Sequence, residues 1–229
     1  MFKYLKAEYL KMVHSKHLLW INVLLLLYTA LILLLYYSDG LHAYDILPNY
    51  NDEYFVLFLM LSVFWGLSSV GDEMNYRTDL WYSKNKFILF KVFFLALYIL
   101  FIYILSFIMF NLCTFVIHNA FYFSFSVIFS LLKCFPLYFF WGLFSMFISV
   151  VIRKSNISML IIVSVFLWLE YIKGALYNLN GIFKYIFIFH LNMNKVIVEE
   201  ISFESSAIIN LIAIVFVIYL IFISYYKRS

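Results

Sequence analysis

The charged and polar side chains that could bind a partner or do chemistry gather in one stretch between two apolar runs. This polar stretch is GDEMNYRTDLWYSKNKF, residues 71–87. If a helix begins at Asp72, its first turn is acidic and its end is basic through Lys84 and Lys86, the order that suits a helix dipole. A short helix of this kind is suited to docking into a groove of a soluble partner. Its partly apolar contact surface would consist of Met74, Tyr76, Leu80, Trp81 and the Tyr82 ring. A solvated loop with the same charges fits the stretch equally well.

Glu170 is a second candidate, because it stands in an apolar run three residues before Lys173, on the same face of a helix. Ionisable side chains at membrane depth are rare and often mark a substrate path or a gate, here with Lys133 or Lys173 as partner. The commoner explanation is that such long side chains snorkel to the outer interface. Both readings of Glu170 stay open.

Other catalytic or ligating groups are sparse. The apolar runs hold isolated serines and no acid paired with a histidine, so an intramembrane enzyme is the weakest interpretation. Histidine and cysteine show no ligand spacing, so no metal site is expected. The six glycines form no G-x-x-x-x-G-K-[ST] phosphate loop. If the protein uses ATP, the ATPase is therefore another chain, and this chain carries no cofactor of its own.

The elements that must position these groups are apolar helices. Hydrophobic residues make up 66% of the 229 positions and charged residues only 12%, which excludes a polar exterior and predicts an all-α polytopic membrane protein. Continuous apolar runs without strict alternation favour helices over a barrel. We expect a single transmembrane domain over residues 1–229. Its six spans are predicted at Leu18–Tyr37, Tyr54–Val70, Phe87–Ile117, Phe125–Ile152, Ile157–Leu176 and Ser206–Tyr226.

The distribution of Lys and Arg predicts the orientation. With a cytoplasmic N-terminus, the cytoplasmic side carries 12 of the 16 basic residues, while most acids fall on the other side. The positive-inside rule therefore places both termini in the cytoplasm of a multi-pass cell-membrane protein. This topology explains the net charge of +4 without a nucleic-acid partner.

Two further segments are predicted to lie at the membrane surface. Residues 1–17 have apolar side chains at helical spacing and four lysines, as in a helix lying in the interface. Alternatively, the lysines only orient the first span. Between spans five and six, residues 181–190 are strongly apolar but too short to cross, as expected of a re-entrant or interfacial element.

The order of these features resembles the permease subunits of ABC-2 type exporters, above all the short permeases of Gram-positive lantibiotic and bacitracin export or self-immunity systems. In that family an acid closes the second span, an Arg-Thr-like pair follows, and a Ser/Lys-rich stretch precedes a Lys at the start of the third span. The corresponding residues here are Glu73, Arg77, Thr78, Ser83, Lys84 and Lys91. Asp79 and Trp81 depart from the small residues common in such loops.

The resemblance implies a dimer of identical or related permeases with two cytoplasmic ATP-binding subunits, which would hold ATP and Mg. Such an assembly would move an amphipathic peptide antibiotic or a lipid-like compound outward. Residues 1–17 and 71–86 would contact the ATPase. The implied coupling residues are Asp72, Glu73, Met74, Tyr76, Arg77, Thr78, Leu80 and Trp81. The alternative is a polytopic membrane protein that transports nothing, such as a sensor or an assembly factor.

Small residues indicate close helix contacts. Ser62 and Gly66 form a small-xxx-small pair on the second span, and Gly142, Ser145 and Ser149 form a small-residue stripe on the fourth. Either set could serve a contact within one subunit or a dimer seam. In the resembled family the second and fifth spans face the partner across the translocation path, which favours Ser62 and Gly66 for that role.

Overall fold

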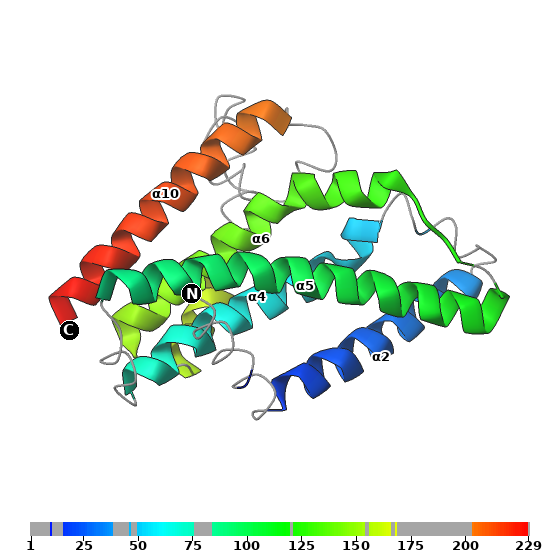
Figure 1. The fold of residues 1–229 in the computed structure, drawn as a ribbon, viewed down its shortest axis with the longest axis horizontal. Coiled ribbons are helices and arrows are strands. Elements are labelled where there is room, and N and C mark those ends of the chain that lie inside the picture. The colour runs from blue at the N-terminus through cyan, green and yellow to red at the C-terminus, as the bar shows by residue number, and fades with distance from the viewer. Residues whose placement is uncertain are drawn as a thin grey trace. The chain divides into compact units, whose positions relative to one another are not determined.

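A computed structural model describes residues 16–38, 50–75, 84–119, 121–153, 156–165 and 203–228, with the single positions 10, 46 and 168. Every regular element within these ranges is a helix. The long helices are α2 (His17–Ser38), α4 (Tyr50–Asn75), α5 (Lys84–His118), α6 (Phe125–Ile152) and α10 (Phe203–Arg228), drawn in Figure 1. The all-α prediction is thereby confirmed for the described part of the chain.

Each of these five long helices contains a stretch that is long and apolar enough to cross a membrane. The stretches are Leu19–Ser38, Glu53–Val70, Lys86–Ile117, Cys134–Ile152 and Ile208–Tyr226. They coincide with five of the six predicted spans, and the chain is a multi-pass membrane-embedded protein. The remaining predicted span, at 157–176, is described as a helix from Asn156 to Val165, and most of its second half lies outside the described residues.

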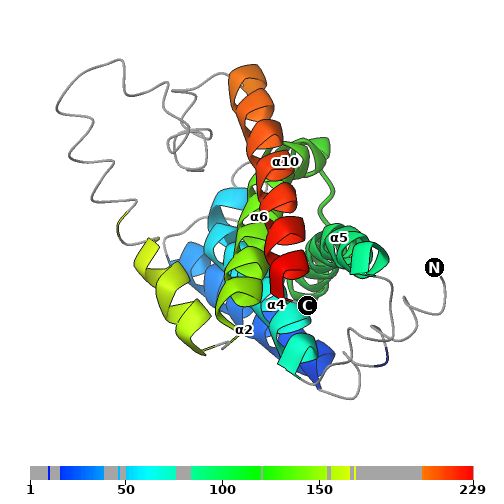
Figure 2. The same cartoon turned by 90° about the vertical axis from the view of Figure 1, so that its left-hand side faces the viewer.

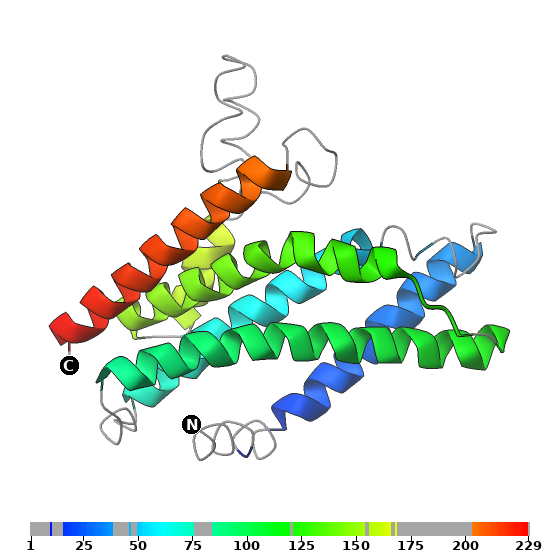
Figure 3. The same cartoon turned by 45° about the horizontal axis from the view of Figure 1, so that its top comes forward.

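The helices belong to two compact units. Unit 1 comprises residues 1–56 and 97–131, and unit 2 comprises residues 57–96 and 132–229. The helices of unit 1 can be followed in Figure 3, and those of unit 2 in Figure 2. α4, α5 and α6 each contribute residues to both units.

Unit 1 is built around buried tyrosines. Tyr50 at the start of α4 is fully buried, and its ring stacks on Tyr54 with centroids 4.5 Å apart. The edges of Phe107 and Phe110 on α5 meet the Tyr50 ring at 5.9 and 5.7 Å. Edge-to-face and offset aromatic pairs of this kind are favourable beyond the area they bury, so Tyr50 fixes the start of α4 against α5.

Stacked aromatic side chains join helices of unit 2. Trp65 on α4 stacks on Phe94 of α5 with centroids 5.5 Å apart, and Phe87 of α5 stacks on Tyr225 of α10 at 5.7 Å. All four side chains are buried. These contacts join the N-terminal part of α5 to helices that precede and follow it in the chain.

The outer faces are apolar. On α10 the large exposed side chains are Ile208, Leu211, Ile212, Val215, Phe216 and Tyr219, and α2 has a similar exposed stripe that includes Leu27 and Leu34. Exposed apolar surface of this extent would be a liability in water but is the expected lining of a protein in hydrocarbon. The composition therefore reflects a lipid-facing exterior as well as an apolar core.

The structure corrects one predicted boundary. Residues 71–75 are helical and continue α4, so no separate helix begins at Asp72, and the two acids stand in the last turns of α4 instead of a first turn. The helix continues because Gly71 is a single glycine, which costs only about 1 kcal/mol in a helix interior, and no proline follows it. Residues 76–83 lie outside the described residues, as do nearly all of residues 1–15 and the whole apolar segment 181–190.

Two helices end at a residue in the left-handed conformation. Asn119 after α5 has a φ of 54° and Arg153 after α6 has a φ of 59°. In each case the backbone N–H donates to a carbonyl four residues back, Phe115 and Ser149 respectively. This is the αL type of helix termination, in which asparagine is the usual substitute for glycine.

Pro136 lies inside α6, which is helical from Phe125 to Ile152.

Candidate functional site

A close helix contact in unit 2 joins α4 to α6 at Gly66. A methyl group on Gly66 would overlap the Ser145 Oγ and the Gly142 carbonyl oxygen, so only glycine permits this approach. Gly142 in turn faces Leu95 of α5, whose Cδ1 would lie 2.8 Å from an added Cβ. Small residues at a helix crossing allow the backbones to come close, which is the main source of packing energy between helices in lipid.

Hydroxyl groups complete the contact. The Ser149 Oγ on α6 donates to the Leu67 carbonyl oxygen of α4 at 2.8 Å, and this bond crosses between the helices. The Ser145 Oγ donates to the Gly142 carbonyl at 2.7 Å within α6. Both serines are fully buried. The predicted small-residue stripe on the fourth span therefore forms the partner surface of Gly66 within one chain.

The other residue of the predicted pair, Ser62, is fully buried and donates to the Leu59 carbonyl of its own helix at 2.8 Å. The sequence left two roles open, a helix contact within one subunit and a dimer seam. For Gly66 the structure shows a contact within one chain. A substrate path or dimer seam at Ser62 and Gly66 stays a prediction, and it would require α4 and α6 to separate there.

α4 connects this contact to the predicted coupling segment. From Gly66 the helix continues without a break through Asp72, Glu73 and Met74 to Asn75, a rise of about 14 Å. These three predicted coupling residues thus belong to α4 itself. The other five, Tyr76, Arg77, Thr78, Leu80 and Trp81, lie outside the described residues.

On the far side of the polar stretch the chain resumes as α5, where Lys91 is only 1% exposed. Its ammonium group lies over the Phe87 ring, 5.5 Å from the centroid, and Phe87 stacks on Tyr225. A cation over an aromatic face gains stabilisation that increases when the pair is desolvated. Lys91, which the family resemblance placed at the start of the third span, is therefore buried and packs on the Phe87 ring within α5.

A network of tyrosine hydroxyls in unit 1 was missed by the sequence reasoning, which gave the Tyr50 and Tyr54 hydroxyls no role. The Tyr54 hydroxyl donates to the Thr29 Oγ1 at 2.8 Å, joining α4 to α2. The Tyr50 hydroxyl donates to the Ser106 Oγ at 2.9 Å, joining α4 to α5. The available signal was the spacing of Tyr50 and Tyr54, which places them one helical turn apart on one face.

Glu53 belongs to the same network. The Tyr36 hydroxyl donates to a Glu53 carboxylate oxygen at 2.6 Å, and the Tyr28 hydroxyl donates to the Glu53 backbone carbonyl at 2.8 Å.

Tyr50 precedes the span, and burial is the main cause that raises the pKa of its hydroxyl above the usual value. At neutral pH the buried tyrosines act as neutral hydrogen-bond donors, so the network holds helices together.

The remaining predicted residue, Glu170, lies outside the described residues, and the side chain of Lys133 is not described. Within the described ranges no three His, Cys, Asp or Glu residues are grouped closely enough to hold a metal ion.

No protein-family model, no curated protein and no solved structure matches this chain. The fold and its contacts define a helical multi-pass membrane protein.

Proposed function

We propose that this protein is the permease subunit of an ATP-driven exporter of the ABC-2 type, working with a separate cytoplasmic ATPase. The supporting observation is the continuity of α4, which runs from the close contact at Gly66 to Asn75 and leads directly into the polar stretch. A transport subunit without an ATPase domain needs such a connection, because the work is done by another chain.

In this proposal the ATPase binds the polar connector, residues 71–86, and moves it during hydrolysis. α4 follows as a rigid rod, since its residues between Gly66 and Asn75 form one helix. The Ser149–Leu67 hydrogen bond and the glycine contact carry that movement to α6. Coupling through packed, rigid elements is a common physical route between distant sites.

The proposed orientation has both termini in the cytoplasm of the cell membrane, in keeping with the positive-inside rule. A second permease, identical or related, completes the path, and the exposed apolar faces of α2 and α10 are available to lipid or to that second subunit. The proposed cargo is an amphipathic peptide antibiotic or a lipid-like compound moved outward. ATP and Mg would bind to the ATPase only.

Purification of the tagged chain from its native membranes in mild detergent tests the proposal. We expect a soluble protein with a phosphate-binding loop to co-purify and to hydrolyse ATP in the complex. Arg77→Gln and Trp81→Ala should release this protein while the permease still inserts into the membrane. Lys154→Gln is the matched control, because it removes one positive charge from another predicted cytoplasmic loop.

The outcomes separate the two function classes. Loss of the ATPase with the two connector variants but not with Lys154→Gln supports the permease. A chain that purifies without any ATPase, or that retains it in all three variants, argues for the non-transporting alternative or for a different docking site.

A further inference from the structure

α5 is longer than a bilayer requires. Its apolar stretch, Lys86–Ile117, contains 32 residues and is about 48 Å long, whereas the hydrocarbon core is about 30 Å thick. To fit entirely within the core the helix would need a tilt of about 50°, which exceeds the usual range of about 0–40°. Part of its apolar length must therefore leave the hydrocarbon or be held at its boundary.

Contacts within unit 1 show which segments pack along the far part of α5. The Tyr103 hydroxyl donates to the Val127 carbonyl near the start of α6, and Phe107 meets Phe123 with ring centroids 6.1 Å apart. The start of α4 reaches the same level, because Tyr50 packs against Phe107 and Phe110. Beyond Phe110, Cys113 still lies close enough to Tyr54 of α4 to interact electrostatically, and Asn111 and Phe115 contact the returning chain.

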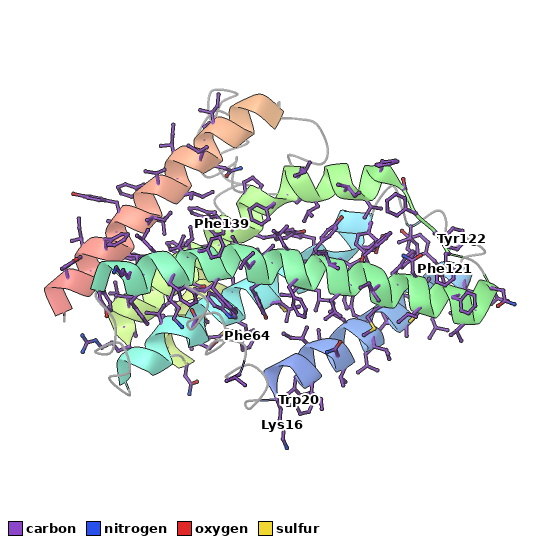
Figure 4. The ribbon with its side chains drawn as sticks, in the orientation of Figure 1. Lys16, Trp20, Phe64, Phe121, Tyr122 and Phe139 are labelled. Atoms are coloured by element: carbon purple, nitrogen blue, oxygen red, sulfur yellow. The ribbon has the colours of Figure 1, made fainter. Side chains whose placement is uncertain are left out.

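The returning chain folds back along α5. The Phe121 ring stacks on Phe115 at 4.7 Å, and the Tyr122 N–H donates to the Asn111 Oδ1 at 2.9 Å. Figure 4 shows Phe121 and Tyr122 beside the far end of α5. We define the α5 tip as residues 111–119 together with residues 121–125.

The large apolar side chains of the α5 tip are exposed. Val116 is 83% exposed, and the exposed fractions of Phe121, Phe123 and Phe125 are 68%, 64% and 75%. The chain carries no Asp, Glu, Lys or Arg in the 41 residues 92–132, which include the whole turn. A water-exposed turn is normally polar, and a protein-binding surface normally includes some charge around an apolar centre.

We propose that the α5 tip lies in the headgroup layer of the bilayer, covered by lipid, with α5 crossing the membrane at a tilt of about 40°. At that tilt the apolar stretch rises about 37 Å, which ends within the headgroup region because a bilayer with its headgroups is about 40–45 Å thick. Lipid is the partner that fits a surface with aromatic side chains and no charge, since aromatic residues concentrate at the membrane interface. This inference is independent of the proposed transport function.

Fluorescence quenching in phosphatidylcholine vesicles tests the position of the tip. In a background with Cys113→Ala and Cys134→Ala, Phe121→Cys and Val116→Cys are labelled one at a time with an environment-sensitive dye. Leu27→Cys in α2 is the control for deep lipid exposure, and Asp45→Cys is the control for water, since residue 45 lies between the first two predicted spans. Co-elution with the unlabelled protein on gel filtration verifies the fold of each variant.

We expect lipids brominated near the headgroup to quench labels at 116 and 121 more than lipids brominated at the chain ends, with the reverse order at 27. Iodide should quench both tip labels about fivefold less than the label at 45. Iodide quenching equal to that at 45 would place the tip in water and overturn the proposal. Protection from both quenchers would show that protein covers the tip, for example a second copy, and would overturn it as well.

Discussion

The Ser149 hydroxyl on α6 donates a 2.8 Å hydrogen bond to the backbone carbonyl of Leu67 on α4, 82 positions away in the sequence. Leu67 follows Gly66, whose missing side chain allows the two helices to meet. The bond and the close contact are therefore parts of one junction, and the first prediction concerns its tolerance of added volume.

Gly66→Ala should destabilise the protein by about 1–3 kcal/mol, because the new methyl group overlaps the Gly142 backbone oxygen, which cannot move without shifting α6. Gly142→Ala is the matched control, since the three atoms nearest to its methyl group belong to the flexible end of the Leu95 side chain and none to a backbone. The thermal midpoint of the detergent-solubilised protein, followed by gel filtration, should fall more for Gly66→Ala. An equal fall for both variants would contradict the geometry.

Tyr54→Phe should cost about 0.5–1.5 kcal/mol, because it removes the bond that joins α4 to α2 and leaves the buried Thr29 hydroxyl without that donor. Tyr37→Phe on the exposed face of α2 should have almost no effect, since Tyr37 is 69% exposed. A double-mutant cycle with Thr29→Val should give a coupling energy of about 0.6 kcal/mol or more. Additive single effects would mean that the bond contributes nothing.

Alkaline pH should weaken unit 1 through Tyr50. Burial raises the pKa of its hydroxyl above the value of 10.0 that it has when exposed. The folded protein therefore keeps Tyr50 neutral while the unfolded chain ionises, so this contribution to stability is complete below pH 10 and declines as the pH rises above it. Thermal midpoints of the wild type should fall faster between pH 10 and 11 than those of Tyr50→Phe. If the thermal midpoints of the two proteins fell in parallel, Tyr50 would not be the cause of the loss of stability at alkaline pH.

The left-handed residue after α5 offers a backbone test. Asn119 has a φ of 54°, which glycine adopts freely and alanine does not. Asn119→Ala should lower stability by about 1 kcal/mol, while Asn119→Gly should leave it unchanged or slightly higher. Thermal unfolding of the two variants side by side is sufficient, because neither removes a buried side chain. The reverse order would show that the helix end is not left-handed in the membrane.

The sequence was most informative about helix number and length, because the bilayer thickness sets the length of a span. The run at 87–117 corresponds closely to α5, Lys84–His118. The predicted end of the second span at Val70 agrees with the apolar stretch Glu53–Val70, but the helix itself continues through Gly71 and the charges that follow it to Asn75. Hydropathy marks where lipid contact stops, whereas a helix ends where its backbone hydrogen bonds stop.

Helix partners were much harder to predict. Small-residue spacing located Gly66 and Ser149, but spacing along a helix does not identify the helix on the other side. The spacing of Tyr50 and Tyr54 placed them on one face of a helix but did not identify Thr29 as the partner of Tyr54, because every span of this chain is rich in aromatic residues. Which helices pack together depends on the shapes of side chains and the positions of hydroxyl groups at residues distant in sequence. Hydrophobic periodicity gives no information about either.

The uncharged stretch from Val92 to Leu132 also has a consequence for biogenesis. A helix pair whose connecting turn carries no charge has nothing in that turn to hold it on either side of the membrane during synthesis. α5 and α6 would then enter the bilayer together as one hairpin, with Lys84 and Lys86 in the first turn of α5, Lys133 within α6 and Arg153 after α6. Insertion of the pair would be a single event, and the aromatic turn would cross the hydrocarbon as its leading edge.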